Sequence, residues 1–381
     1  MDNSRYIEEC CDKFRQILQE QLARAEKMKN DVEKVDYSKC GKIVIGLCDG
    51  DGIGPVIMKE AKALIEKLLE DEIHIGKVEL RKIDGLTIEN RLARNQSVPD
   101  DVLSKIKECN VLLKGPTTTP KGGTMESANV TLRRELDLFA NVRPVTVEEE
   151  GIDWIFFREN TEGEYTLGSR GVEIPDSLAV DFKVTTNPGT ERIARAAFDY
   201  AKANGKNLVS VVTKANIMKK TDGNFSRICN EIAKEYEGIE VEDWYIDIMS
   251  ANLINRELRK KFQVFLLPNL YGDIITDEAA EIQGGVGTAG SANIGDRYAM
   301  FEAIHGSAPR MIEEGLGEYA NPSSIFKSTE MMLRHIGFSE KADKLAKVLK
   351  KCTEEEIIVV DGSASNATCK EFSDYIINNL D

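Results

Sequence analysis

The sequence is short of basic residues, has few histidines and contains no long hydrophobic run. Its 381 residues include 65 Asp and Glu against 50 Lys and Arg, a formal net charge of -15 at pH 7. This excess of negative charge would repel a phosphate backbone, so the composition argues against nucleic-acid binding. No apolar segment approaches the roughly 20 residues that a membrane-spanning helix needs. With 41% hydrophobic and 7% aromatic residues, the chain is predicted to be soluble and globular.

Several common catalytic and metal-binding motifs are also missing. The eight cysteines form no C-x-x-C pair, and the three histidines are too few for a histidine-rich metal site. There is no Walker P-loop, no H-E-x-x-H and no G-x-S-x-G. The first thirty residues are charged throughout and lack the apolar segment of a signal peptide, so we expect a cytoplasmic protein with reduced thiols.

Apolar strand patterns alternate with helical patterns along most of the chain. This alternation predicts an α/β fold with mainly parallel sheets that are covered on both faces. At roughly 150 residues per domain, the length favours two domains. Residues 5–32 predict an additional amphipathic helix, which we expect to pack on its own domain or on a neighbouring subunit. The other expected elements are strands at 42–47, 110–116, 154–160, 208–216 and 264–273, and helices at 55–69, 190–204, 223–236 and 331–336.

Two groups of charged residues could carry chemistry. Asp273 and Asp277 are four residues apart, so a helix would place both carboxylates on one face, where they would suit Mg²⁺ or Mn²⁺. A solvated helix face is the alternative. Convergent arginines suit a small polycarboxylate, although surface salt bridges explain them equally well in isolation. The arginines in question, at 133, 134, 143 and 158, share one region with Ser127 and Asn129.

Considered together, five ordered segments resemble the isocitrate/isopropylmalate dehydrogenase family of metal-dependent β-decarboxylating dehydrogenases. They are GDGIGP at 50–55, KGPTTTP at 114–120, NLYGDIITD at 269–277, GSANIG at 290–295 and HGSAP at 305–309. The resemblance implies a two-domain α/β fold that is not a Rossmann fold. It also implies a large cofactor-binding domain at 41–138 and 285–381, and a small domain at 139–284 with an intersubunit arm near 163–187. The N-terminal helical extension at 1–40 falls outside the resemblance.

The resemblance implies a specific substrate. Ser127 and Asn129 are similar to the Ser-x-Asn pattern of isocitrate dehydrogenases, where a hydroxyl and an amide can bind the additional carboxylate of isocitrate. We therefore expect oxidative decarboxylation of isocitrate to 2-oxoglutarate, a reaction of the tricarboxylic acid cycle. Dehydrogenation of 3-isopropylmalate, homoisocitrate or tartrate remains open, as does a non-catalytic regulatory subunit. Glu126 departs from the family pattern, and we expect its carboxylate to point away from the substrate.

The resemblance also implies a role for each matching residue. Tyr165 would protonate the enol, and Lys214 of the partner subunit would assist removal of the hydroxyl proton. Because such sites are shared, the expected assembly is a homodimer or a higher homo-oligomer. The substrate would be bound by Ser127, Asn129, Arg133, Arg143 and Arg158, and Mg²⁺ or Mn²⁺ by Asp273 and Asp277 with Asp247 of the partner subunit.

The implied coenzyme is NAD or NADP. Arg310 favours NADP by its charge, whereas Met311 and the C-terminal residues 361–365 resemble NAD-using members, so NAD is expected. Thr119 and Asn216 would lie near the nicotinamide. The adenosine side would be lined by Glu302, His305, Gly306, Arg310 and Asn321.

Overall fold

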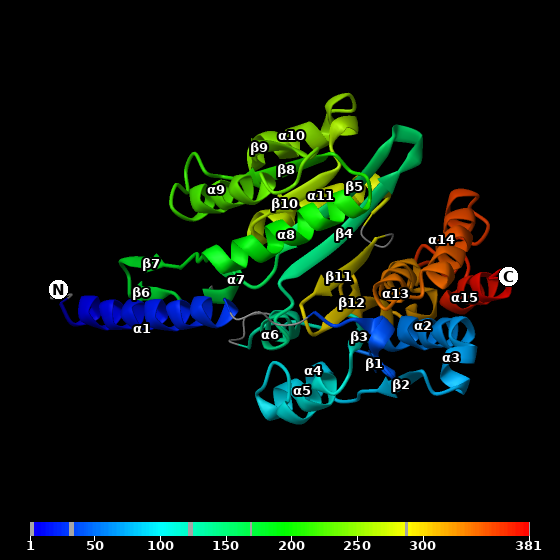
Figure 1. Cartoon of the computed structure of the whole chain (residues 1–381). Helices are drawn as coiled ribbons and strands as arrows, with labels where there is room; N and C mark the ends of the chain where they lie inside the picture. The colour runs from blue at the N-terminus through cyan, green and yellow to red at the C-terminus, as the bar shows by residue number, and fades with distance from the viewer. Residues whose placement is uncertain (1–3, 30–33, 121–124, 168–169, 286–288, 381) are drawn as a thin grey trace. The chain divides into compact units, whose positions relative to one another are not determined.

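The computed structural model describes residues 4–29, 34–120, 125–167, 170–285 and 289–380. The chain divides into two compact units (Figure 1). Unit 1 comprises residues 1–33, 139–141 and 146–278, and unit 2 comprises 34–138, 142–145 and 279–381. The N-terminal helix therefore groups with unit 1, although the residues that directly follow it, 34–138, belong to unit 2.

Unit 2 is built on strands in the spatial order β2-β1-β3-β12-β11. The first three pairings are parallel and the last is antiparallel. The middle strands are nearly continuously buried, because helices cover them as in other parallel sheets. The strands are β1 (Ile43–Cys48), β2 (Val78–Lys82), β3 (Val111–Lys114), β11 (Gly290–Ile294) and β12 (Ala299–Ala303).

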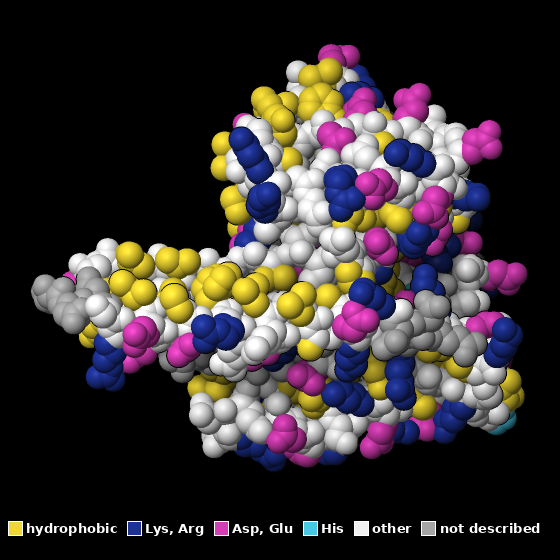
Figure 2. Space-filling model, turned by 60° about the vertical axis from the view of Figure 1, so that its left-hand side comes forward, with side chains coloured by type: hydrophobic (Ala, Val, Ile, Leu, Met, Phe, Trp, Pro, Cys, Tyr) yellow, Lys and Arg dark blue, Asp and Glu magenta, His cyan; other side chains and the backbone are white. Residues whose placement is uncertain are grey.

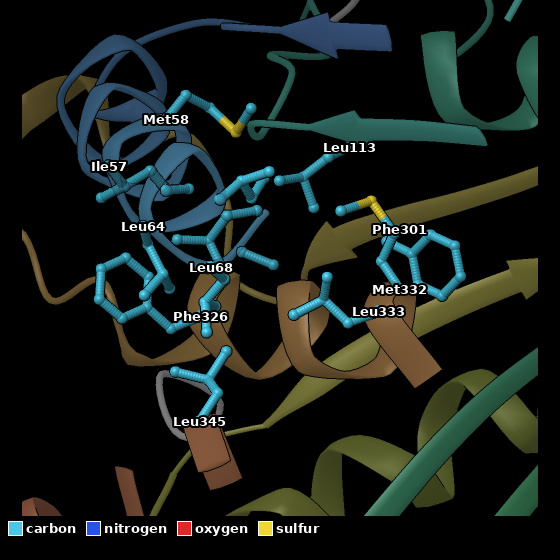
Figure 3. Close-up of a cluster of buried hydrophobic side chains, with 14 of the residues drawn as sticks. Ile57, Met58, Leu64, Leu68, Leu113, Phe301, Phe326, Met332, Leu333 and Leu345 are labelled. Carbon is cyan, nitrogen blue, oxygen red and sulfur yellow. The ribbon is translucent and has the colours of Figure 1, made fainter. Parts of the chain in front are cut away.

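The core of unit 2 lies between this sheet and its helices (Figure 3). Pro55 stands in the first turn of α2, where its missing N–H is not needed. Leu64 and Leu68 of α2 then recur four residues apart and face Phe326 of α13 and Leu113 of β3. The helices are α2 (Gly54–Leu68), α3 (Glu70–His74), α4 (Ile88–Arg94), α5 (Asp100–Lys107), α6 (Ala128–Glu135), α12 (Pro309–Glu313), α13 (Ser323–His335), α14 (Ser339–Glu354) and α15 (Cys369–Asn378).

Unit 1 has a parallel sheet in the order β5-β10-β8-β9. A separate antiparallel pair, β6 and β7, lies within the segment expected to form the intersubunit arm, of which residues 168 and 169 are outside the described residues. The residues of β4 (Ala140–Val147) are divided between the two units. The strands are β5 (Ile152–Glu159), β6 (Val172–Ile174), β7 (Leu178–Val180), β8 (Leu208–Thr213), β9 (Glu240–Tyr245) and β10 (Val264–Leu267). The helices are α1 (Ser4–Met28), α7 (Glu164–Leu167), α8 (Asn187–Ala203), α9 (Thr221–Ala233), α10 (Ile246–Ile254) and α11 (Asn269–Gln283), the last of which runs on into unit 2.

Helix α1 packs on unit 1 along one face. Ile17 is buried, Phe14 stacks on Phe182 with ring centroids 5.5 Å apart, and Lys13 donates to the carbonyl of Gly171 at 2.7 Å. Its other face leaves Leu22 70% exposed, and Figure 2 shows a row of hydrophobic side chains along this helix. Packing on its own domain, one of the two expected arrangements, is therefore observed.

The structure confirms the predicted α/β class and its mainly parallel sheets. The strand expected at 264–273 is wrong in its second half, because β10 ends at Leu267 and Asn269 begins α11. Asp273 and Asp277 consequently lie on a helix. Among the described residues, no helix is both long enough and apolar enough to span a bilayer.

Candidate active site

A cluster of polar side chains in unit 1 is centred on Asp273 in the second turn of α11. Arg158, at the end of β5, donates from Nη1 to Asp273 Oδ1, and the hydroxyl of Tyr165 on α7 donates to Asp273 Oδ2. Asn269 Oδ1 accepts from Arg158 Nε at 3.0 Å and from Nη2 at 2.6 Å. The Arg158 side chain is fully buried. Three elements thus bring an arginine, a tyrosine and a carboxylate together.

Gly272 makes this close approach of α11 to β5 possible. A Cβ atom at this position would lie 2.6 Å from Arg158 Cγ and 2.7 Å from Arg158 Cβ, which is closer than such contacts occur. The glycine of the NLYGD segment is therefore needed so that the arginine can lie flat against the helix.

Asp277 follows Asp273 by one helical turn, so the two carboxylates share a face of α11. Carboxylate oxygens are the ligands that Mg²⁺ and Mn²⁺ prefer, and these residues fit such an ion. Among the described residues of this one chain, no group of three or more His, Cys, Asp or Glu could hold a metal. The pair on α11 would therefore need water, substrate oxygens or a carboxylate from a partner chain.

Lys214 and Asp247 form a second charged group in unit 1. Lys214 follows β8, Asp247 begins α10, and Lys214 Nζ lies 2.5 Å from Asp247 Oδ1. This hydrogen bond lowers the pKa of Asp247. The side chains are 25% and 59% exposed, and the apolar residues on the same and adjoining segments, Ile217, Tyr245, Ile248 and Ile254, are also exposed. The pair lies on an open, partly apolar surface.

Helix α6 of unit 2 carries three of the expected substrate residues. Ser127 precedes the helix, Asn129 lies in its first turn, and Arg133 follows one turn later. Arg133 Nη2 donates to Glu302 Oε1 at 3.3 Å, while its buried Nε has no partner among the described residues. A buried donor without a partner is what a substrate carboxylate could satisfy. Glu126 accepts from Thr131 and Arg134, so its carboxylate is engaged on the helix itself.

Glu302, which is expected to line the adenosine side of the cofactor, is buried on β12. Its carboxylate pairs with Lys114 at 3.1 Å and Arg133 at 3.3 Å, and accepts from Asn293 at 3.0 Å. Burial alone would raise the pKa of Glu302, but the two cations outweigh it and lower the value to about 2. Glu302 thus holds the guanidinium of Arg133 in place, a role the sequence motifs did not indicate.

Arg143, another expected substrate residue, is buried on β4 in unit 2.

The glycine-rich segment at 50–54 brings three loops of unit 2 together. A Cβ on Gly52 would lie 1.9 Å from the carbonyl oxygen of Ser307, and one on Gly50 would lie 2.2 Å from that of Pro116. Asp51 accepts from the backbone N–H groups of Ile88 and Thr118, both at 2.7 Å. The motif therefore joins the loop that carries Thr119 to the loop that carries His305.

The expected adenosine side lies around the loop at 305–310. Burial lowers the pKa of His305, whose buried Nε2 has no partner among the described residues. Gly306 is exposed, with open space where a Cβ would lie. Arg310 pairs with Glu314 at 2.6 Å on the surface. The orphaned ring nitrogen is compatible with a ligand at this loop.

The C-terminal segment around residues 361–365, which the sequence already associated with the coenzyme, adjoins this loop. Asn321 Nδ2 donates to the carbonyl of Val360 at 2.8 Å, and a Cβ on Gly362 would lie 3.5 Å from Met311 Cε. The carboxylate of Asp361, between these two contacts, is exposed. The structure thus adds an acidic residue to the neighbourhood of Met311.

The structure assembles the sequence-predicted residues into several groups. In unit 1, Arg158 and Tyr165 meet at Asp273, and Lys214 meets Asp247. Thr119 in unit 2 and Asn216 in unit 1 are exposed. The residues that the motif analysis missed are Lys114 and Asn269. Each lies inside one of the family segments, at 114–120 and 269–277, but the sequence does not show which buried side chains it contacts.

The family sequence model described as Isocitrate/isopropylmalate dehydrogenase matches residues 44–376. This chain belongs to the isocitrate/isopropylmalate dehydrogenase family. It is 39% identical over 350 residues to "Isocitrate dehydrogenase [NADP]" of Rickettsia prowazekii, covering 88% of this chain and 69% of that protein. It is 36% identical over 349 residues to "Homoisocitrate dehydrogenase" of Methanocaldococcus jannaschii, covering 87% and 95%.

Solved structures agree with this assignment. The crystal structure of isocitrate dehydrogenase from Methylococcus capsulatus superposes with a TM-score of 0.77 and 34% sequence identity, covering 89% of this chain and 99% of that one. The expected family and fold are therefore confirmed. Helix α1 lies before the matched region, which begins at residue 44.

Proposed function

We propose that this family member is an isocitrate dehydrogenase, which oxidises and decarboxylates isocitrate to 2-oxoglutarate and CO₂ with NAD as the coenzyme. The observation that carries the proposal is the cluster of Arg158 and Tyr165 on Asp273. A cation, a hydroxyl donor and a candidate metal ligand in contact suit the removal of CO₂ from a hydroxy acid. Ser127 and Asn129 supply polar groups for an additional carboxylate, which isopropylmalate lacks.

The proposed roles of the chain's residues are metal binding, substrate binding and proton transfer. Asp273 and Asp277 would hold Mg²⁺ or Mn²⁺ with Asp247 of the partner subunit, and the bound ion would supply Lewis-acid polarisation of the substrate oxygens. Arg133, Arg143 and Arg158 bind and orient the carboxylates. Lys214 of the partner subunit assists removal of the hydroxyl proton. Tyr165 delivers a proton from its hydroxyl to the enol carbon after CO₂ has left.

The surface around Lys214 supports a homodimer with shared sites. Ile217, Ile248 and Ile254 are 66%, 47% and 67% exposed. Contiguous exposed apolar residues typically mark an association surface. A second copy covering this surface would enclose Lys214 and Asp247, which are exposed here, and could carry them to an active site.

Two observations support NAD as the coenzyme. Arg310 pairs with Glu314, so part of its charge is already engaged. Asp361 lies between residues that contact Asn321 and Met311, and a carboxylate there would repel the 2′-phosphate of NADP. The adenosine side would be lined by Glu302, His305, Gly306, Arg310 and Asn321. Thr119 and Asn216 near the nicotinamide remain predictions, as does a cytoplasmic location.

Homoisocitrate is the strongest alternative substrate, because one relative bears that name at 36% identity. Isocitrate and homoisocitrate differ by one methylene, and hydrogen-bonding groups in the pocket discriminate such pairs only modestly. A non-catalytic regulatory role is disfavoured, because the chain retains Tyr165, Lys214 and all three aspartates.

The test is an initial-rate assay of coenzyme reduction with Mn²⁺, run in parallel with NAD and NADP. The substrates are isocitrate, homoisocitrate, 3-isopropylmalate and tartrate, and EDTA removes the metal. EDTA-sensitive reduction of NAD with isocitrate as the best substrate is the expected result. Faster turnover of homoisocitrate would overturn the substrate assignment but keep the metal site. Inactivity with every acid would overturn the enzymatic proposal.

A further inference from the structure

Helix α1 makes a direct contact with the segment that carries Tyr165, although it lies outside the region matched by the family. Arg24 Nη1 donates to Glu162 Oε1 at 2.9 Å, and Arg24 Nη2 donates to Thr161 Oγ1 at 3.1 Å. The Glu162 side chain is 3% exposed and the Arg24 side chain is 24% exposed. The contact is therefore an enclosed, two-point interaction rather than a surface salt bridge.

The segment that Arg24 contacts contains two buried carboxylates. Glu159 accepts from Thr161 N at 2.9 Å, from Thr161 Oγ1 at 2.7 Å and from Glu162 N at 2.6 Å. Glu162 accepts from Thr186 N at 2.8 Å and from the Thr186 hydroxyl. Buried acids need compensating cations. Two arginines contact this segment: Arg24, and Arg192, which donates to Thr161 Oγ1 at 2.9 Å.

The same residues hold the catalytic cluster through their backbone atoms. The carbonyl of Glu162 accepts from Asn269 Nδ2 at 3.0 Å, and Asn269 in turn holds the guanidinium of Arg158. The carbonyl of Thr161 accepts from Thr166 Oγ1 at 2.6 Å, beside Tyr165 on α7. Arg24 thus donates hydrogen bonds to the side chains of Thr161 and Glu162. The backbone carbonyls of the same two residues accept from Thr166, next to Tyr165, and from Asn269, which contacts Arg158.

We propose that Arg24 is a positioning residue for this active site, holding residues 159–166 so that Arg158 and Tyr165 stay in contact with Asp273. The inference rests on the proposed function for its catalytic consequence. It gives the appended helix a role in turnover, because the chain from Arg24 through Glu162 and Asn269 to Arg158 is continuous. Loss of Arg24 removes its hydrogen bonds to Glu162 and Thr161 and takes one cation away from the Glu162 carboxylate.

The experiment compares Arg24→Gln with Arg15→Gln in the full-length protein. Arg15 lies on the same helix and pairs with Asp12 at 2.6 Å, but both side chains are largely exposed. We expect Arg24→Gln to lower kcat for isocitrate about tenfold, a loss typical of removing an outer positioning contact. Backbone hydrogen exchange in residues 159–166 should become faster. Arg15→Gln should match the wild type in both measurements.

The conservative variant Arg24→Lys sharpens the test. Lysine keeps the charge and can reach one acceptor, so it should recover part of the rate and of the exchange protection. It also carries the test if Arg24→Gln fails to fold. A lower melting temperature with unchanged kcat and unchanged exchange at 159–166 would show that Arg24 only anchors the helix, and would overturn the proposal.

Failure of the proposed function would look different. If the wild-type protein turned over none of the acids, the enzymatic proposal would fail, and the exchange measurement alone would decide the positioning role. Equal exchange in Arg24→Gln and the wild type would then overturn it.

Discussion

Unit 1 contains two ion pairs of opposite character, Arg158 with Asp273 and Lys214 with Asp247. The Arg158 side chain is fully buried and fixed by three hydrogen bonds, whereas Lys214 is 25% and Asp247 59% exposed. An exposed pair contributes only about 0–1 kcal/mol to stability. The first pair is completed by its own chain, and the second is exposed, as the proposed shared site requires of a group that acts in a partner's site. This difference is the strongest structural argument for a shared active site.

The largest expected effect tests that difference directly. Tyr165→Phe and Lys214→Met should each lower kcat by about 10²–10⁴-fold, because each removes a proposed proton-transfer group. Heterodimers that combine one copy of each variant should regain about half of the wild-type rate per dimer, because one of the two symmetric sites then has both native residues. The measurement is the rate of purified, differently tagged heterodimers.

The control is a homodimer of each variant carried through the same tagging and exchange procedure, which should stay inactive. No recovery in the heterodimer would contradict a shared site and would place Lys214 and Tyr165 in the same chain's site or outside it.

The enclosed cluster should tolerate little added volume. Gly272→Ala would place a methyl group against Arg158, displacing the guanidinium from Asn269 and Asp273. We expect the KM for isocitrate to rise about tenfold or more, since a positioning contact is lost. Gly223→Ala is the matched control, because a Cβ there meets open space on helix α9. An unchanged KM in Gly272→Ala would show that the close contact is not needed for substrate binding.

Motifs in the sequence predicted the fold better than they predicted contacts. The apolar runs at 42–47 and 154–160 became strands β1 and β5, because continuous burial in a parallel sheet leaves a strong compositional pattern. The run at 264–273 was extended too far, since its second half is polar enough to begin a helix. Asp273 and Asp277 were identified from their spacing and from the NLYGDIITD segment, but the contact of Asn269 with Arg158 was not. The pairing of Glu302 with Lys114 and Arg133 was also beyond the sequence, because it joins strand β12 to strand β3 and helix α6, which are far apart in the chain.

Coenzyme choice depends on exposed residues of unit 2, in contrast to the largely buried cluster of unit 1. Asp361→Asn should raise kcat/KM for NADP relative to NAD about tenfold, equivalent to about 1.4 kcal/mol, because a charge that repels the 2′-phosphate is removed. Arg310→Ala should change the ratio by less than about twofold, since this arginine is exposed and paired with Glu314. Initial rates with both coenzymes supply the ratio. A larger effect at Arg310 than at Asp361 would reverse the assignment of the discriminating residue.

The smallest expected effect is on the pH dependence of the melting temperature, which should differ between variants of a buried and of an exposed carboxylate. Burial raises the pKa of Glu159 above its ordinary 4.5, and the neighbouring Glu162 raises it further. The native state therefore binds this proton more tightly than the unfolded state, and stability falls as pH rises from about 4.5 towards neutrality. Glu159→Gln cannot lose a proton, so its melting temperature should fall less over that window, by a difference of a few degrees at about 2–4 °C per kcal/mol.

Glu20 provides the matched exposed case. A hydrogen bond from Arg170 lowers its pKa, so its contribution is complete above the ordinary carboxylate value and is lost only as pH falls further. Glu20→Gln should consequently leave the slope between about pH 5 and about pH 8 unchanged. Melting temperatures of the wild type and both variants at several pH values decide the matter. Parallel curves for Glu159→Gln and the wild type would mean that the enclosed carboxylate titrates normally, and that burial behind the Asp273 cluster is less complete than its hydrogen bonds imply.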